Sequence, residues 1–216
     1  MFGVIFDMDG TLLDTQSTSV PAWEHAGRIQ GYDGVGSCIY KICGMNKLGW
    51  SKYLLALYPD LDIERFSSDV AKYINEHLVV KYKPGGKEIL DFLREKGIKM
   101  GLASGSNREV AEKRLSAVEA RDYFDAVVAG TEVENGKPAP DIFLLTAEKM
   151  GISPEKCFVI EDSPNGIRAG QRAGMKCIGI PDVVEFEDEI KAILYSENTN
   201  FFEVIQLFEE LLQNGG

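Results

Sequence analysis

Residues 3–14 read Gly-Val-Ile-Phe-Asp-Met-Asp-Gly-Thr-Leu-Leu-Asp, a short apolar run that stops abruptly at Asp7. The run is continuous and not alternating, which is typical of a strand covered on both faces in a parallel sheet. Similar apolar runs recur at 98–103, 124–129, 157–160 and 176–180. These five segments are the predicted strands.

Segments with helical periodicity lie between the later runs, at 84–96, 107–118, 140–150 and 165–173. Gly97, Gly151 and Gly174 follow three of them, and glycine is common just after the end of a helix. Strands that alternate with helices predict an α/β fold with a doubly wound, Rossmann-like parallel sheet.

The segment 16–81 interrupts this alternation. It holds three helical stretches, near 16–30, 47–58 and 62–81, and no convincing strand. We therefore expect a small α-helical cap domain at 16–81, inserted into an α/β core domain formed by 1–15 and 82–216.

Charge and composition exclude several classes of protein. The 216 residues carry 23 Lys and Arg against 34 Asp and Glu, a net charge of −11, so nucleic acid and anionic membranes are not expected as partners. No apolar run approaches the roughly 20 residues of a membrane-spanning helix, and residues 1–10 lack the basic region of a signal peptide. None of the four cysteines forms a C-x-x-C pair. We therefore expect their thiols to be reduced and their side chains to serve in packing. These features predict a cytoplasmic protein.

Chemically active residues follow the predicted strands where they end. They are Asp7 and Asp9 after the first, Ser104, Gly105 and Ser106 at the second, Lys137 in the loop after the third, and Glu161 and Asp162 at the fourth. Ligands of open α/β sheets bind at the carboxyl ends of the strands, so we expect one site there. Converging carboxylates need a hard cation, and an ion shared with phosphate favours Mg²⁺. The backbone N–H groups after Ser104 suit a phosphate, and Lys137 adds positive charge beside it.

Each of these residues also has a simpler interpretation when taken alone. The acidic and serine residues could cap helices, and Lys137 could be a solvated surface residue. Their joint occurrence at four strand ends favours a functional site. Other sites are not supported: there is no Walker A sequence, and the only histidines, His25 and His77, lie in predicted cap helices and not near this edge, as a Ser-His-Asp hydrolase would need.

The sequence resembles the haloacid dehalogenase superfamily, in the subfamily with a helical cap inserted after the first motif. The motif D-x-D-G-T-L-x-D stands at 7–14, and the serine of the second motif is Ser104. The lysine of the third motif is Lys137 in Gly-Lys-Pro-Ala-Pro-Asp, and the acidic fourth motif is Glu161-Asp162-Ser-Pro-Asn-Gly. The resemblance spans nearly the whole chain and implies a magnesium-dependent phosphatase of a small phosphorylated metabolite, acting as a monomer.

The resemblance also implies the roles of the residues. Asp7 is expected to attack phosphorus and become an aspartyl phosphate. Asp9 is expected to protonate the leaving alkoxide and then to deprotonate the attacking water. Ser104 and Lys137 are expected to hold the transferring phosphoryl group.

The implied metal ligands are acidic residues of the first and fourth motifs. Asp7 and Asp162 would bind Mg²⁺ through their carboxylates and Asp9 through its backbone carbonyl. Glu161 would lie nearby and act through water.

A phosphomutase similar to β-phosphoglucomutase is the alternative function. Where the mutase pattern has a histidine, this chain has Ser19; where its cap loop reads G-x-x-R, this chain has Gly44-Met-Asn-Lys47. Thr11 also replaces a small aliphatic residue of that pattern. These departures favour hydrolysis. A catalytically inactive scaffold is a third alternative, and the intact set of acidic and phosphate-binding residues argues against it.

Substrate choice is expected to lie with the cap. We expect the cap to be mobile and its closure to shield the phosphoryl group from water and bring Lys47 toward the substrate. Trp23 and Trp50 are further candidate contacts, with packing inside the cap as the alternative.

Overall fold

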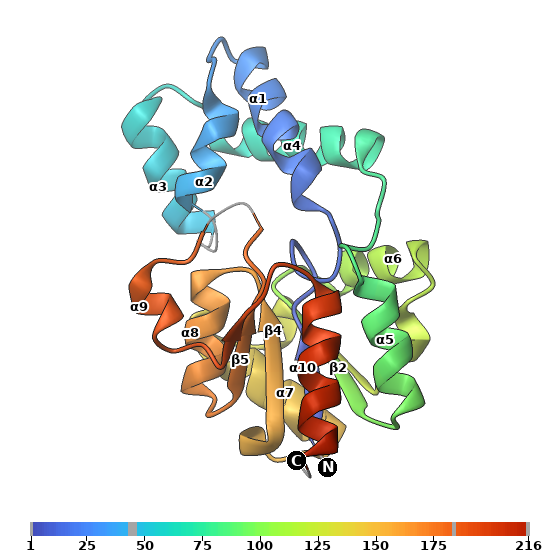
Figure 1. The fold of residues 1–216 in the computed structure, drawn as a ribbon. Helices are drawn as coiled ribbons and strands as arrows, with labels where there is room; N and C mark the ends of the chain where they lie inside the picture. Colours follow the sequence, from blue (N-terminus) through green and yellow to red (C-terminus); the bar gives the residue numbers. More distant parts are fainter. Residues whose placement is uncertain (1, 43–46, 183–184, 215–216) are drawn as a thin grey trace. The chain divides into compact units, whose positions relative to one another are not determined.

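The computed structural model describes residues 2–42, 47–182 and 185–214, without the side chains of Lys47 and Leu48 (Figure 1). Contacts divide the chain into two compact units. The larger comprises Met1–Asp14 and Val80–Gly216, and the smaller comprises Thr15–Val79.

The larger unit is built on a six-stranded sheet in the order β3-β2-β1-β4-β5-β6. The strands are β1 (Gly3–Phe6), β2 (Lys99–Ser104), β3 (Ala126–Ala129), β4 (Cys157–Glu161), β5 (Lys176–Gly179) and β6 (Ser196–Glu197). Every neighbouring pair is parallel, which confirms the predicted doubly wound α/β fold. The sequence did not predict β6, because two residues are too short to form an apolar run.

Helices cover both faces of this sheet. They are α5 (Gly86–Glu95), α6 (Arg108–Ala117), α7 (Asp141–Met150), α8 (Pro164–Arg172), α9 (Asp188–Lys191) and α10 (Phe201–Gln213). Val4 and Phe6 of β1 pack with α5 and α10, which lie side by side in Figure 1, whereas Ile5 packs with α7 and α8 on the opposite face. This alternation follows from the two-residue period of a strand, and it explains why β1 is apolar throughout.

The register of the sheet brings the chemically active strand ends together. Phe6 of β1 lies beside Leu102 of β2 and Ile160 of β4. The next residue, Asp7, donates its backbone N–H to the carbonyl of Ile160 at 3.0 Å. Asp7 is therefore held at the edge where β2 and β4 also end.

The smaller unit is helical in all of its described secondary structure. It contains α1 (Ser19–Ile29), α2 (Ile39–Ile42), α3 (Lys47–Leu57) and α4 (Ile63–His77), with short 3-10 helices at Gln16–Thr18 and Val35–Cys38. The Trp23 ring lies 5.3 Å from that of Trp50 and 5.1 Å from that of Phe66, between centroids. Both tryptophans therefore pack in the core of this unit.

The remaining side chains singled out by the sequence have ordinary surroundings. His25 and His77 flank the ring of Tyr73, with centroid distances of 5.0 and 4.0 Å. Free, buried thiols are found at Cys38, Cys157 and Cys177. None of the helices in the described part of the chain has the length and apolar character needed to cross a membrane.

Candidate active site

Lys137 links the ends of three strands. Its Nζ atom donates to Asp7 Oδ1 at 2.5 Å, to Glu161 Oε1 at 2.7 Å and to the carbonyl oxygen of Ala103 at 3.3 Å. These partners follow β1, end β4 and lie in β2. Only 13% of the Lys137 side chain is exposed, so its ammonium group is held among protein oxygens and is not a solvated surface charge.

The Glu161 carboxylate accepts from protein donors on both of its oxygens. Oε2 accepts from the backbone N–H of Ser163 at 2.7 Å and from its hydroxyl at 2.9 Å, while Oε1 accepts from Lys137. Gly166 of α8 leaves room for this arrangement, because a Cβ atom there would lie 1.7 Å from Oε1. Glu161 therefore orients Lys137, and its expected link to a metal through water stays a prediction.

Asp162 is buried beside the turn that follows β1. The Thr11 hydroxyl donates to Asp162 Oδ1 at 2.7 Å. Thr11 can reach Asp162 because the preceding Gly10 takes a φ of +86°, in the left-handed region that favours glycine. The segment 7–11 thus places two residues at the same edge of the sheet: Asp7, and Thr11 as the hydrogen-bond donor to Asp162.

Burial and mutual repulsion raise the pKa values of the acidic groups. Burial raises the pKa of Asp7 to about 7, opposed by Lys137 and assisted by the charges of Glu161 and Asp9. Burial, followed by the charges of Glu161 and Asp7, also raises the pKa of Asp162 well above its usual range. Burial alone would lower the pKa of Lys137, but the attraction of Asp7 and Glu161 outweighs it and raises the pKa. One ammonium group thus leaves excess negative charge in the cluster.

This excess of negative charge suits a small divalent cation. Among the described residues, no three His, Cys, Asp or Glu side chains are grouped so that side chains alone could hold a metal ion. The reason is geometric: the Glu161 oxygens are used by Lys137 and Ser163, and the Asp9 carboxylate is directed elsewhere. Two carboxylates, Asp7 and Asp162, remain. Mg²⁺ commonly uses one or two carboxylates and fills its octahedral shell with water and phosphate oxygens, so the residues fit this ion.

The turn between β2 and α6 has the features of an anion-binding site. Ser104 is completely buried, and its Oγ accepts the backbone N–H of Ser106 at 3.1 Å. Asn107 caps α6 by accepting the N–H of Val110 at 2.9 Å. Gly105 is exposed and has no neighbour within 4 Å of the position of a Cβ atom. A phosphoryl group can therefore approach the backbone of this turn at the positive end of the α6 dipole.

Asp9 is directed toward this turn. Its Oδ2 accepts from the Ser106 hydroxyl at 2.9 Å and lies 3.4 Å from the Ser104 hydroxyl. Its Oδ1 forms an ion pair with Arg114 of α6. Arg114 is not among the residues predicted from the sequence, because a helical position ten residues after Ser104 carries no signal of its own until α6 is placed against the turn.

The structure brings the predicted residues of the core site to one edge of the sheet, and their roles in catalysis and binding stay predictions. Lys47 is the first residue of α3, and its side chain lies outside what the structure describes. Its expected role in substrate recognition stays a prediction.

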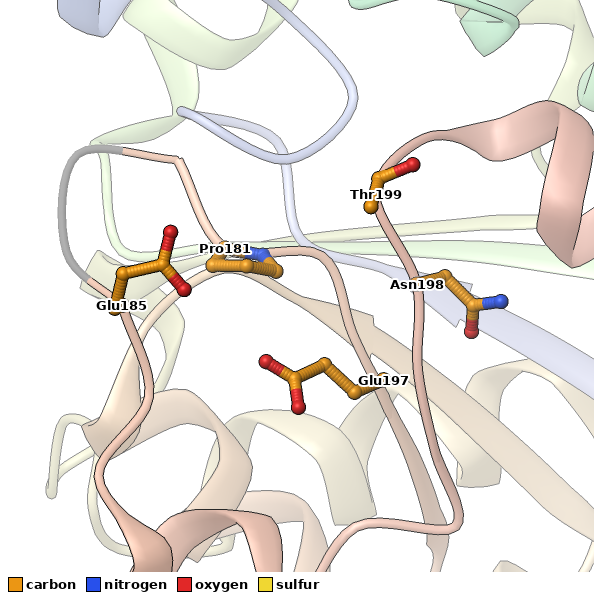
Figure 2. A pocket seen from close by; sticks show the side chains of 5 residues that line it. All are labelled: Pro181, Glu185, Glu197, Asn198 and Thr199. Atoms are coloured by element: carbon orange, nitrogen blue, oxygen red, sulfur yellow. The ribbon is translucent and has the colours of Figure 1, made fainter.

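A separate cavity of about 390 Å³ lies near the ends of β5 and β6 (Figure 2). It is lined by Pro181, Glu185, Glu197, Asn198 and Thr199, none of which belongs to the predicted site. Its two carboxylates do not suit an anionic phosphate ester.

Known proteins resemble this chain over most of its length. A family model described as haloacid dehalogenase-like hydrolase matches residues 3–174. A phosphorylated carbohydrates phosphatase of Thermotoga maritima is 34% identical over 200 residues, covering 90% of each protein. A fructose-1-phosphate phosphatase of Escherichia coli is 34% identical over 184 residues, covering 82% of this chain and 95% of that protein.

Solved structures agree with this result. A Thermotoga maritima protein assigned as a β-phosphoglucomutase superposes with a TM-score of 0.79 at 30% identity, covering 97% of this chain and 99% of that one. A Pseudomonas syringae hydrolase has a TM-score of 0.81 at 25% identity, with the same coverage. Asp7, Ser104, Lys137 and Asp162 all lie within the range of the family match.

Proposed function

Because the chain belongs to the haloacid dehalogenase-like hydrolases, we propose that it is a magnesium-dependent phosphatase of small phosphorylated sugars. The observation that carries this proposal is the buried group of Asp7, Lys137 and Asp162 at the ends of β1 and β4, on the edge of the sheet where the turn before α6 also lies. The group supplies a nucleophile, a cation and metal ligands at one edge. An ester that presents a phosphoryl group to this edge is the substrate that uses all three.

The proposed reaction takes two in-line displacements at phosphorus. An oxygen of Asp7 attacks, the ester P–O bond breaks, and the leaving alkoxide takes a proton from Asp9. Asp9 then takes a proton from water, whose oxygen attacks the phosphorus of the aspartyl phosphate. Inorganic phosphate leaves and the Asp7 carboxylate is restored. Two displacements replace one difficult hydrolysis.

The residues around Asp7 match the charges that this reaction develops. Lys137 already binds one Asp7 oxygen, so it lies where it can meet the equatorial oxygens of the phosphoryl group. The carboxylates of Asp7 and Asp162 and the backbone carbonyl of Asp9 would hold Mg²⁺, which neutralises negative charge on the phosphoryl group when bound. Ser104 and the N–H groups of Gly105 and Ser106 are proposed to hold the remaining oxygens.

Sugar phosphates are the proposed substrate class. Support comes from the two relatives named above, one a phosphorylated carbohydrates phosphatase and the other a fructose-1-phosphate phosphatase, both 34% identical to this chain. The acidic charge of the protein, −11, argues against polyanionic substrates. The free cysteines at Cys38, Cys157 and Cys177 suit a reducing compartment, and we propose the cytoplasm.

A panel of phosphorylated metabolites tests the proposal. Purified protein should release phosphate from fructose 1-phosphate or a related sugar phosphate with Mg²⁺, and excess EDTA should abolish the release. Ca²⁺ should inhibit, since it prefers a larger and looser shell of ligands. Undiminished turnover in chelator, or no release from any sugar phosphate of the panel, would contradict the proposal.

The phosphomutase remains the second candidate, because a solved structure 30% identical to this chain is assigned to that activity. The product formed from β-glucose 1-phosphate separates the two functions. A phosphatase gives glucose and inorganic phosphate, whereas a mutase gives glucose 6-phosphate.

A further inference from the structure

Arg114 is a charged residue near the site that the reaction above does not use. It lies in α6, and its guanidinium group forms an ion pair with Asp9 Oδ1. Its side chain is 17% exposed and that of Asp9 is 26% exposed. A charge-assisted contact that is mostly shielded from water restricts both groups more than a surface ion pair does.

The two oxygens of Asp9 have different partners, and this fixes the direction of the carboxylate. Oδ1 pairs with Arg114, while Oδ2 accepts from the Ser106 hydroxyl at 2.9 Å. The same guanidinium nitrogen lies 3.5 Å from Ser106 Oγ, so Arg114 contacts both the Asp9 carboxylate and one of the hydroxyl groups that donate to it. Rotation of the Asp9 carboxylate about its χ angles would break contacts on both oxygens.

We propose that Arg114 is a positioning residue that holds the Asp9 carboxylate in place for proton transfer to the leaving group. The inference rests on the proposed function, since it takes the role of Asp9 from there. Arg114 contacts Asp9 and Ser106 and acts through them. Loss of Arg114 should therefore spare nucleophilic attack and impair protonation of the leaving oxygen.

Leaving groups of different basicity separate these two effects. An alkoxide leaving from a sugar phosphate needs a proton, and positioned general acids contribute about 10²–10⁴-fold to such steps. A p-nitrophenolate leaves without one. The ratio kcat/KM reports the first displacement alone, because it covers the steps up to transfer of the phosphoryl group to Asp7.

The test compares Arg114→Met with wild type on fructose 1-phosphate and p-nitrophenyl phosphate. We expect kcat/KM to fall about 10–100-fold on the sugar phosphate and less than about 3-fold on the aryl phosphate. Arg114→Lys should recover part of the loss, since it restores a cation. Lys113→Met removes an exposed charge from the same helix and should match wild type on both substrates.

A second comparison places the effect on Asp9. In an Asp9→Asn background, Arg114→Met should cause no further loss on the sugar phosphate, because the partner it positions is already disabled. Additive losses, equal losses on both substrates or no loss at all would overturn the inference. Should Arg114→Met unfold at the assay temperature, Arg114→Gln provides the same comparison. A wild-type protein that releases no phosphate from either substrate contradicts the proposed function itself, and so is distinguishable from failure of the Arg114 inference alone.

Discussion

The Nζ atom of Lys137 lies 2.7 Å from Oε1 of Glu161, and that carboxylate rests where a side chain on Gly166 would be. The position of the lysine therefore depends on a glycine in the first turn of the next helix. The Glu161 carboxylate, the Lys137 ammonium group and the space left by the absence of a Cβ atom at Gly166 therefore depend on one another.

Gly166→Ala tests this dependence. The added Cβ atom would lie 1.7 Å from Glu161 Oε1, so the carboxylate must move and Lys137 loses its orientation. We expect stability to fall by about 1–3 kcal/mol, as in overpacked cores, together with a large loss of kcat. Urea unfolding and steady-state kinetics measure the two effects. Gly136→Ala is the control for stability, since no atom lies within 4 Å of its Cβ position; equal stability of the two variants would disprove the clash.

Without metal, the acidic cluster should make stability fall as pH rises. Burial raises the pKa of Asp7 to about 7 in the folded protein from its ordinary value of 3.8, so between these values the folded state holds more protons than the unfolded one. Ionisation of Asp7 therefore lowers the free energy of unfolding more and more as the pH rises from about 4 to about 7. Asp162 acts in the same direction. The melting temperature in EDTA should fall over this window, and less steeply in Asp7→Asn.

Magnesium should reverse this trend. Metal binding requires deprotonated carboxylates, so the rise in melting temperature caused by Mg²⁺ should be larger at pH 7.5 than at pH 5.5. Asp122→Asn, which changes an exposed carboxylate, should behave as wild type. An equal Mg²⁺ effect at both pH values would argue against binding to the Asp7 and Asp162 carboxylates.

Asp7→Asn should abolish turnover. A neutral amide is a poor nucleophile and a weaker metal ligand, and its size keeps the packing at the end of β1. We expect less than 1% of the wild-type rate, consistent with the loss of a covalent nucleophile. Mass spectrometry of the purified variant must exclude deamidation to Asp. A retained rate of a few per cent in undeamidated protein would rule out a covalent route through Asp7.

Lys47→Ala tests the sequence-based prediction for substrate recognition. The variant should lose about 2–4 kcal/mol of transition-state binding for a sugar phosphate, and much less for a small aryl phosphate, which requires few contacts beyond the phosphoryl group. Lys52→Ala, an exposed lysine of the same helix, is the control. Equal losses on both substrates would mean that Lys47 serves the fold or the chemistry.

The sequence was enough to predict that the residues at the strand ends lie close together, because parallel strands place their carboxyl ends at one edge of the sheet. Asp7, Ser104 and Asp162 each end an apolar run, and that position alone indicates the edge of the sheet where they lie. The direction of each side chain was not predictable. Asp7 is directed to Lys137 and Asp9 to Arg114, although only Met8 separates them, and this choice depends on how α6 packs.

Among the elements that were not predicted, α10 and β6 were missed for different reasons. The helix α10 has buried Phe201, Val204 and Phe208 at helical spacing, so its signal was present in the sequence and was not used. The strand β6 has only two residues and pairs with β5 through Ser196 and Glu197, which have no apolar pattern. Its existence depends on the sheet that is already in place.

Direct detection of an aspartyl phosphate is the most informative measurement. Wild-type protein mixed with a sugar phosphate and Mg²⁺, quenched in acid within the first turnover and digested, should give a peptide containing Asp7 that is heavier by one phosphoryl group. With p-nitrophenyl phosphate, whose leaving group needs no proton, Asp9→Asn should accumulate more of this species than wild type, because the base that activates water is missing. Asp7→Asn should give none with either substrate. Release of inorganic phosphate without any phosphorylated Asp7 peptide, or with the phosphoryl group on another residue, would contradict covalent catalysis by Asp7.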